Sequence, residues 1–139
     1  IVNTMFGDVW YAPTNDLLQA KLIDDAKGNY IFKDKKGENS LSLTFEEVYT
    51  TGKSANYWIN VTNVNSLAEM KASYPNYAWF DAFKKGNVYA YNKRMNAKGS
   101  NDYFEQGILR PDIILNDLGK IFYPNLFPTY DLYFYQQLK

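Results

Sequence analysis

The sequence predicts an α/β domain in which helices cover a central, mainly parallel β-sheet. Short segments rich in β-branched and aromatic residues alternate along the chain with amphipathic segments of helical period. Because strands that alternate with helices usually form βαβ units, this order favours a parallel sheet. The length of 139 residues suits one domain, and no internal repeat or low-complexity linker divides the chain.

The first third of the chain predicts one helix among short strands. Apolar residues recur at helical spacing over 15–28, with Thr14 or Asn15 able to cap the start and Gly28 suited to the position after the end. The strands carry the β-branched and aromatic residues that fit a pleated surface. They are expected at 1–3, 8–12 and 29–32.

Two capping boxes predict helix starts in the middle of the chain. Thr44 with Glu47 marks the first, and Ser66 with Glu69 marks the second. The second helix is expected to stop at Pro75, since the residue before a proline avoids the helical conformation. The remaining elements expected here are a strand at 56–61 and a short aromatic helix at 77–86.

The last third predicts a strand at 87–91, a helix at 110–122 and an edge strand at 130–138. Pro111 suits the first helical position because its missing N–H is not needed there. Asp112 follows in the first turn, where the helix dipole favours a negative charge.

A polar stretch at 92–107 follows the strand at 87–91 directly. In parallel α/β sheets ligands bind beyond the carboxyl ends of the strands, so the position makes this stretch a candidate site. Arg94 offers a planar fork that suits carboxylate, catecholate or hydroxamate oxygens, and Lys93 adds a point charge. The alternative is a solvated connection, with Asn101 or Asp102 capping a short helix.

Composition excludes several classes of function. Lys+Arg and Asp+Glu both number 15, and this formal net charge of +0 provides no field for nucleic acid. No apolar run is long enough to cross a bilayer. The absence of Cys excludes disulfides and thiolate metal sites, and the absence of His removes the commonest general base and zinc ligand. No phosphate-binding glycine motif occurs.

Three segments, "NVYAYNKR" (87–94), "SNDYFEQG" (100–107) and "RPDIIL" (110–115), carry a resemblance to a known family. With them the chain resembles the C-terminal lobe of a class III periplasmic substrate-binding protein, of the type common in Bacteroidetes. Such proteins serve ABC importers for iron-siderophores, haem and cobalamin. The order of the earlier segments is similar too, so the resemblance covers nearly the whole of 1–139.

The resemblance implies a three-layer, Rossmann-like lobe, joined by a long helix to an N-terminal lobe of the same chain. The ligand is held between the lobes, and a surface glutamate of each lobe docks onto arginines of the permease. Glu46 occupies the matching position here, next to the Glu47 of the capping box. "PTND" (13–16) departs from the glycine-rich turn with Ser that is frequent in the family, which puts the ligand contact at this turn in question.

The ligand implied for this chain is an iron chelate of the siderophore kind, since a bare metal ion or haem would favour His. No catalytic residue, metal ligand or cofactor is expected, and the protein is expected in the periplasm with a lipid anchor on a preceding segment. The chain itself begins "IVNTMFG", as a mature product or an excised domain would. The ligand-binding residues expected from the resemblance and the polar stretch are Trp10, Tyr11, Asn92, Lys93, Arg94, Asn101, Asp102 and Tyr103.

Two other functions compete with transport. Asp102 and Glu105 can be interpreted as the carboxylate pair of a carbohydrate-active hydrolase, with aromatic platforms nearby, although nothing in the sequence sets their separation. Aromatic residues make up 18% of the chain, with 13 Tyr, 9 Phe and 3 Trp, and a Tyr-rich surface suits a protein-interaction domain.

Overall fold

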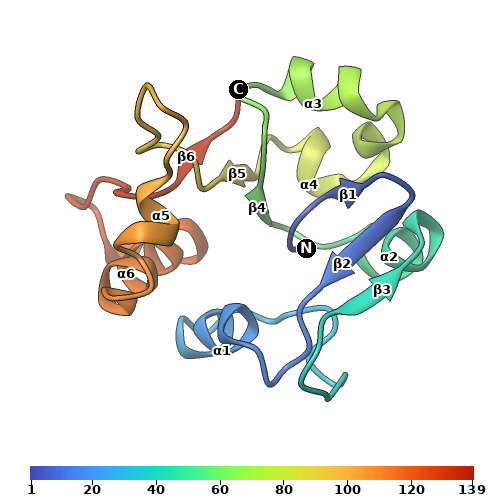
Figure 1. Ribbon diagram of the computed structural model, residues 1–139, viewed down its shortest axis with the longest axis horizontal. Helices are drawn as coiled ribbons and strands as arrows, with labels where there is room; N and C mark the ends of the chain where they lie inside the picture. Colours follow the sequence, from blue (N-terminus) through green and yellow to red (C-terminus); the bar gives the residue numbers. More distant parts are fainter.

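The computed structural model describes residues 1–139 and contains six α-helices, two 3-10 helices and two separate three-stranded sheets (Figure 1). The prediction of one central, mainly parallel sheet with three-layer, Rossmann-like architecture is therefore wrong. The first sheet is antiparallel throughout and contains β1 (Met5–Phe6), β2 (Val9–Ala12) and β3 (Leu41–Leu43). The second is mixed and contains β4 (Trp58–Val61), β5 (Val88–Ala90) and β6 (Gln136–Gln137).

Local turns explain why the first sheet is not parallel. β1 and β2 are joined by a tight turn at Gly7 and Asp8, where Gly7 adopts a φ of +60° that glycine tolerates without strain. β2 therefore pairs with β1 and β3 and does not join β4. Parallel pairing is confined to the β4–β5 ladder and a single bridge between Val2 and Ile59.

The predicted strand at 29–32 is also wrong, because this segment forms turns. The amide of Lys33 bonds the carbonyl of Tyr30, and the amide of Lys35 bonds the carbonyl of Phe32. Both aromatic rings are nevertheless buried, and the Tyr30 hydroxyl donates to the Pro13 carbonyl at 2.7 Å. The apolar pattern at 29–32 therefore correctly indicated buried rings, but the backbone that carries them is not extended.

The helices follow their predicted signals more closely. The Thr44–Glu47 capping box is confirmed in both directions, with distances of 3.2 Å and 2.7 Å. Ser66 caps the amide of Glu69 as predicted, although the Glu69 carboxylate bonds the amide of Asn65 instead of closing the box. The helices are α1 (Leu18–Asp25), α2 (Phe45–Gly52), α3 (Leu67–Ser73), α4 (Asp81–Lys84), α5 (Asp102–Glu105) and α6 (Pro111–Phe122), with 3-10 helices at Pro75–Trp79 and Pro124–Leu126.

Helix α1 is shorter than predicted and ends differently. Neither Thr14 nor Asn15 caps it, because their side chains bond the carbonyls of Gly37 and Lys33. Lys27 adopts the left-handed conformation predicted for Gly28, with a φ of +62°. Glycine is still required at Gly28, since a Cβ there would lie 2.7 Å from the Ile23 side chain and 2.8 Å from the Phe122 ring.

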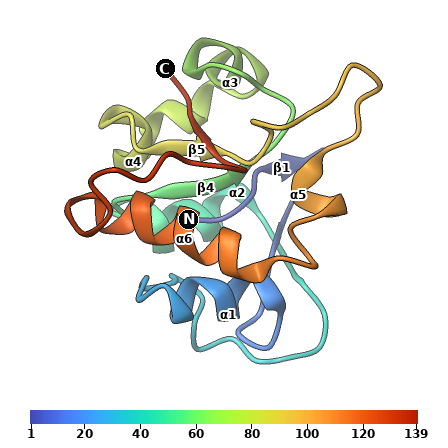
Figure 2. The ribbon, with the colours of Figure 1, turned by 90° about the vertical axis from the view of Figure 1, so that its left-hand side faces the viewer.

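A single core of 29 buried hydrophobic residues joins the two sheets. At its centre the rings of Trp10 and Trp58 stack at 5.5 Å, so that β2 of one sheet packs directly on β4 of the other. Figure 2 shows β4 between α6 and α1 on one side and α3 and α4 on the other. None of the helices has the length and apolar character needed to span a membrane.

Candidate functional site

The polar stretch 92–107 lies at the edge where the parallel segments of the second sheet end. β5 leads into it, β4 ends at Val61 just before Thr62, and the strand-like Val2 leads to Thr4 on the same edge. The hydroxyls of Thr4 and Thr62 face each other at 3.5 Å. Although the sheet is not the predicted one, its local parallel pairing therefore gives this stretch the predicted place beyond strand ends.

Asn92 at the start of the stretch is occupied by internal hydrogen bonds. Its Nδ2 donates to the Val64 carbonyl at 3.2 Å and to Asn65 Oδ1 at 3.1 Å, and its Oδ1 accepts from Gln136 at 2.7 Å. The Asn92 amide thus ties β6 to the segment after β4. With these three bonds the Asn92 side chain braces this edge of the sheet.

The two predicted cations are held by the chain to different extents. The Lys93 ammonium donates to the Leu132 carbonyl. Arg94 donates from Nε to Asp102 Oδ2 at 3.1 Å, and its guanidinium lies 4.1 Å from the centre of the Tyr133 ring. The terminal nitrogens of Arg94 make no hydrogen bond within the chain, and 43% of its side chain is exposed. Arg94 is therefore fixed in direction while keeping donors for an anionic oxygen.

Asn101 is the N-cap of α5, as the alternative interpretation of the stretch predicted. Its Oδ1 accepts from the amide of Tyr103 at 3.0 Å, and its Nδ2 donates to the Tyr91 carbonyl at 3.0 Å. In the connection before it, Asn96 Oδ1 accepts from the amides of Lys98 and Ser100, at 2.9 Å and 3.0 Å. The stretch is consequently an ordered structure held by its own asparagines.

Tyr103 lies under the stretch and not on its surface. Its ring meets that of Tyr91 edge to face at 4.6 Å, and both residues are buried together with Tyr135. Burial raises the pKa of Tyr91 to about 12, and burial also raises the pKa of Tyr103 and, well above its usual value, the pKa of Tyr135. These hydroxyls therefore stay neutral, and the Tyr135 hydroxyl pairs with Asn60 Oδ1.

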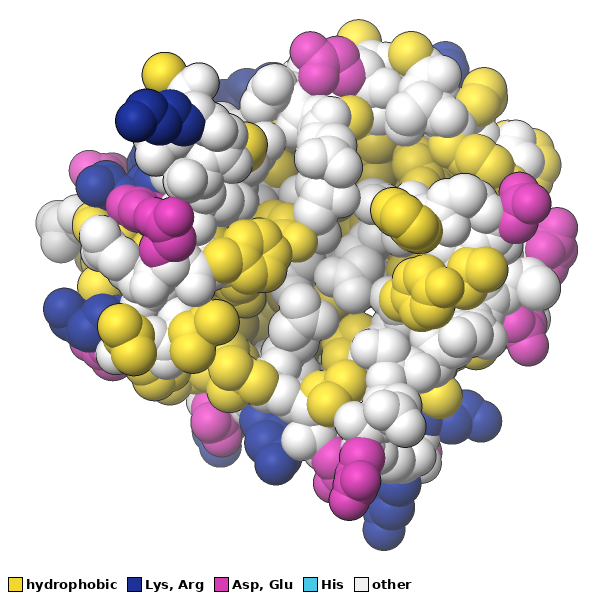
Figure 3. All heavy atoms as spheres, in the orientation of Figure 1, with side chains coloured by type: hydrophobic (Ala, Val, Ile, Leu, Met, Phe, Trp, Pro, Cys, Tyr) yellow, Lys and Arg dark blue, Asp and Glu magenta, His cyan; other side chains and the backbone are white.

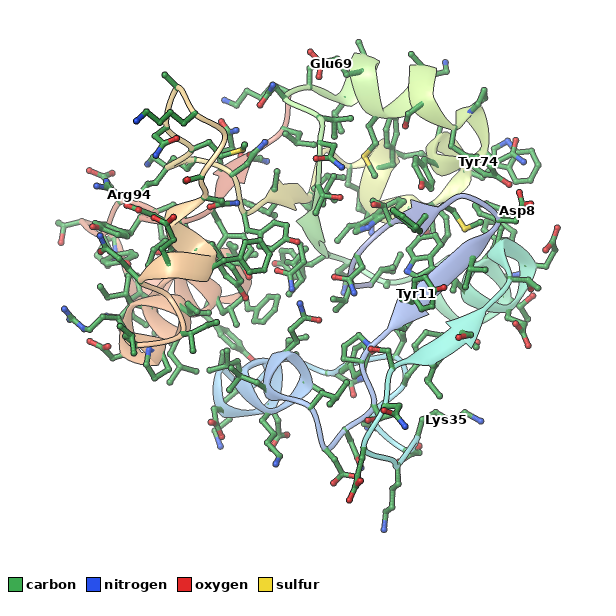
Figure 4. All side chains as sticks on the ribbon, in the orientation of Figure 1. Asp8, Tyr11, Lys35, Glu69, Tyr74 and Arg94 are labelled. Carbon is green, nitrogen blue, oxygen red and sulfur yellow. The ribbon has the colours of Figure 1, made fainter.

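Trp10 and Tyr11 lie on opposite faces of β2, because side chains alternate along a strand. Trp10 is fully buried and donates from its indole N–H to the Val2 carbonyl at 2.9 Å, so it has no surface for a ligand to touch. Tyr11 is 44% exposed. In Figure 4 it lies on β2, across the molecule from Arg94 beside α5, so the predicted ligand-binding residues do not form one cluster.

Exposed apolar side chains on the same face were missed by the sequence reasoning. Hydrophobic side chains gather over α5 and over β1 and β2, with a strip of polar side chains and backbone between them (Figure 3). On the first sheet Phe6 points outward with Tyr11, as their registers require. The apolar pair "IL" after α5 lies outside any helical period, and this could have indicated from the sequence that the two side chains are exposed. The exposed apolar residues of β1, of α5 and of the segment after α5 are Phe6 (78%), Phe104 (52%), Ile108 (62%) and Leu109 (79%).

A larger hollow than any beside this stretch lies elsewhere in the molecule. It has a volume of about 510 Å³ and is lined by Ile1, Tyr57 and Phe122 among others, at the opposite edge of the second sheet. The hollow beside Thr4 and Thr62 is smaller, about 160 Å³. No three acidic side chains lie close enough together to hold a metal ion. Beside α5, Arg94 keeps terminal nitrogens that can donate to a polar ligand, whereas the larger hollow is mostly apolar.

No protein family model and no solved structure matches the chain. An uncharacterized lipoprotein of Methanocaldococcus jannaschii is 30% identical over 126 residues, which cover 90% of this chain and 28% of that protein. The chain thus spans less than a third of the length of this relative.

Proposed function

We propose that this chain is the C-terminal lobe of a class III substrate-binding protein, which captures an iron chelate of the siderophore kind and delivers it to an ABC permease. The supporting observation is the face in Figure 3, where apolar side chains flank a polar strip at the ends of β4 and β5. Apolar surface left uncovered in this way marks a place where another molecule or domain binds. An N-terminal lobe would close over this face, with the ligand between them.

Arg94 is the residue through which this face recognises a negative chelate. Asp102 and the ring of Tyr133 hold the guanidinium in one direction, and its terminal nitrogens are free to donate. A preorganised fork loses little conformational freedom on binding a carboxylate, catecholate or hydroxamate oxygen. Lys93, whose ammonium bonds the Leu132 carbonyl, supports the loop and adds positive potential. Tyr11 supplies an exposed ring on the opposite rim.

The name of the relative supports a place at a membrane. That protein is a lipoprotein, and the present chain matches 28% of its length. We propose that the complete protein here is likewise held by lipid, with this lobe in the periplasm. Glu46 is exposed and makes no ion pair or hydrogen bond, so it is free to dock onto a permease, whereas Glu47 is occupied by its cap.

The experiment compares iron-chelate binding by the complete two-lobe protein and its Arg94→Ala and Arg110→Ala variants. Arg110 is a matched control, because it is also exposed and paired with an aspartate but lies at the start of α6. Loss of Arg94 is expected to weaken binding by about tenfold, since a hydrogen bond to a charged group is removed. Loss of Arg110 should leave affinity unchanged. Equal affinity of all three proteins would refute the assignment.

The two alternatives have less support. The hydrolase requires Asp102 as one of two reacting carboxyls, but Asp102 accepts from Arg94 and serves the loop. The interaction domain rests on a Tyr-rich surface, yet Tyr30, Tyr77, Tyr91, Tyr103 and Tyr135 are all buried. The aromatic content of the chain is therefore explained to a large extent by its core.

A further inference from the structure

A cluster of buried polar side chains lies beneath the polar stretch 92–107. Asn60 on β4 accepts at its Oδ1 from the hydroxyl of Tyr135. The ring of Tyr91 lies beside that of Tyr135 at 6.5 Å, and Tyr103 meets the two rings edge to face at 4.6 Å and 5.8 Å. We call Asn60, Tyr91, Tyr103 and Tyr135 the tyrosine cluster.

Two groups of this cluster have no hydrogen-bond partner within the chain, namely the Nδ2 of Asn60 and the hydroxyl of Tyr91. Both residues are more than nine-tenths buried, with exposed fractions of 2% and 8%. The single fully enclosed side-chain atom without a partner is Asn15 Oδ1, so the two groups of the cluster reach the surface. Because buried polar side chains are nearly always hydrogen-bonded, these donors are available to a molecule that binds there.

The backbone of Asn60 is also unusual. Asn60 adopts a left-handed conformation, with a φ of +59°, in the middle of β4, and the register between β4 and β5 shifts over the same residues. Residues other than glycine are uncommon in this conformation, although asparagine tolerates it better than most. Strained backbone of this kind concentrates at ligand-binding sites, so the conformation supports a functional role for the Asn60 amide.

The cluster carries no charge near neutral pH. Burial raises the pKa of Tyr91 to about 12, and the neighbouring Tyr103 adds to this effect. Burial likewise raises the pKa of Tyr135 well above its usual value, with contributions from Tyr103, Asp117 and Tyr91. The Asp117 carboxylate is itself occupied by backbone amides and by the hydroxyl of Tyr130. The mutual effects on pKa indicate that the hydroxyls of the cluster lie close together, as neutral donors.

We infer that Asn60 Nδ2 and the Tyr91 hydroxyl form a subsite for an uncharged carbonyl oxygen of the ligand, such as that of an amide. Two neutral donors suit such an acceptor, whereas an apolar group would leave them unpaired. A carboxylate is better served by the guanidinium of Arg94. The inference rests on the proposed function for the rest of the ligand, and it adds an amide to the anionic group that Arg94 recognises.

The first test uses N-methylacetamide as a probe of the subsite alone. The complete protein is labelled with ¹³C at Cζ of tyrosine, and the Tyr91 and Tyr89 signals are assigned by their loss in Tyr91→Phe and Tyr89→Phe. Tyr89 is the matched control, because burial also raises its pKa but it lies beside Tyr57, outside the cluster. Titration should shift the Tyr91 signal saturably and leave that of Tyr89 in place. No saturable shift of Tyr91, or equal shifts at both, would overturn the inference.

The second test compares two iron(III) trihydroxamates that each carry one terminal carboxylate and differ only in their linkers. One has amide groups in the linkers, and the other has ethylene groups in their place. Tyr91→Phe should weaken binding of the amide chelate about fivefold, because one neutral hydrogen bond is lost, and should not change binding of the ethylene chelate. Tyr89→Phe should change neither affinity.

The two tests separate the inference from the proposed function. Equal effects of Tyr91→Phe on the two chelates, or no effect on either, would overturn the inference while leaving the proposed function intact. If neither chelate bound the wild-type protein while N-methylacetamide shifted the Tyr91 signal, the proposed function alone would be refuted.

Discussion

Asp117 offers the sharpest test of how the C-terminal segment is held. It is completely buried on α6, and its carboxylate accepts from the amides of Tyr133, Phe134 and Tyr135 at 2.7–3.2 Å. The Tyr130 hydroxyl adds a fourth donor at 2.7 Å. A buried carboxylate without a cation is tolerated only when such donors replace water.

Asp117→Ala leaves these donors without an acceptor. Phe134 and Tyr135 are buried, so their two amides cannot turn to water, and at about 1–3 kcal/mol for each the loss is roughly 2–6 kcal/mol. The total free energy of unfolding of a domain is about 5–15 kcal/mol, so the variant should unfold at a much lower urea concentration. Asp117→Asn keeps one acceptor oxygen, so its urea midpoint should lie between those of the wild type and Asp117→Ala.

The assay is urea unfolding followed by near-ultraviolet circular dichroism, which reports the packing of the aromatic rings. Asp112→Ala is the control on the same helix, because its exposed pair with Arg110 is screened by water and should hardly move the midpoint. If the midpoint of Asp117→Ala matched that of Asp112→Ala, the carboxylate would not be the anchor described here.

A further prediction concerns the close packing at Gly28, between α1 and α6. Gly28→Ala should destabilise the fold by about 1–3 kcal/mol, because its Cβ would overlap the Ile23 and Phe122 side chains; an unchanged urea midpoint would contradict this close packing.

Several signals that act within a few residues predicted the local structure correctly, although the predicted caps of α1 and the predicted strand at 29–32 are wrong. The cap of Thr44, the Pro111 start of α6 and the strand at 87–91 all appear as expected, since each depends on neighbouring residues. The pairing of strands depends on residues far apart in sequence. The order of strands and helices along the chain therefore could not predict which strands pair. The two-residue turn at Gly7 and Asp8 was the missed local signal that β2 begins in a hairpin.

The candidate site shows the same division. The cap at Asn101 depends on neighbouring residues and was predicted. The Arg94–Asp102 pair and the stacking of Arg94 on Tyr133 were not predicted, because they depend on how distant segments of the chain pack against the loop. Residue types indicated which side chains can bind a ligand. They did not show which of those side chains form hydrogen bonds within the chain and are therefore not available to a ligand.

The internal bonding of 92–107 also limits what the face can recognise. The Asn92 and Asn101 amides and the Lys93 ammonium already bond groups of the chain, so a ligand that required them would have to break those bonds. Binding without that cost uses the terminal nitrogens of Arg94 and the exposed ring of Phe104 on the adjacent α5. A chelate that fits this face therefore combines one anionic group with a broad apolar or aromatic surface, and a small, highly charged chelate is expected to bind more weakly.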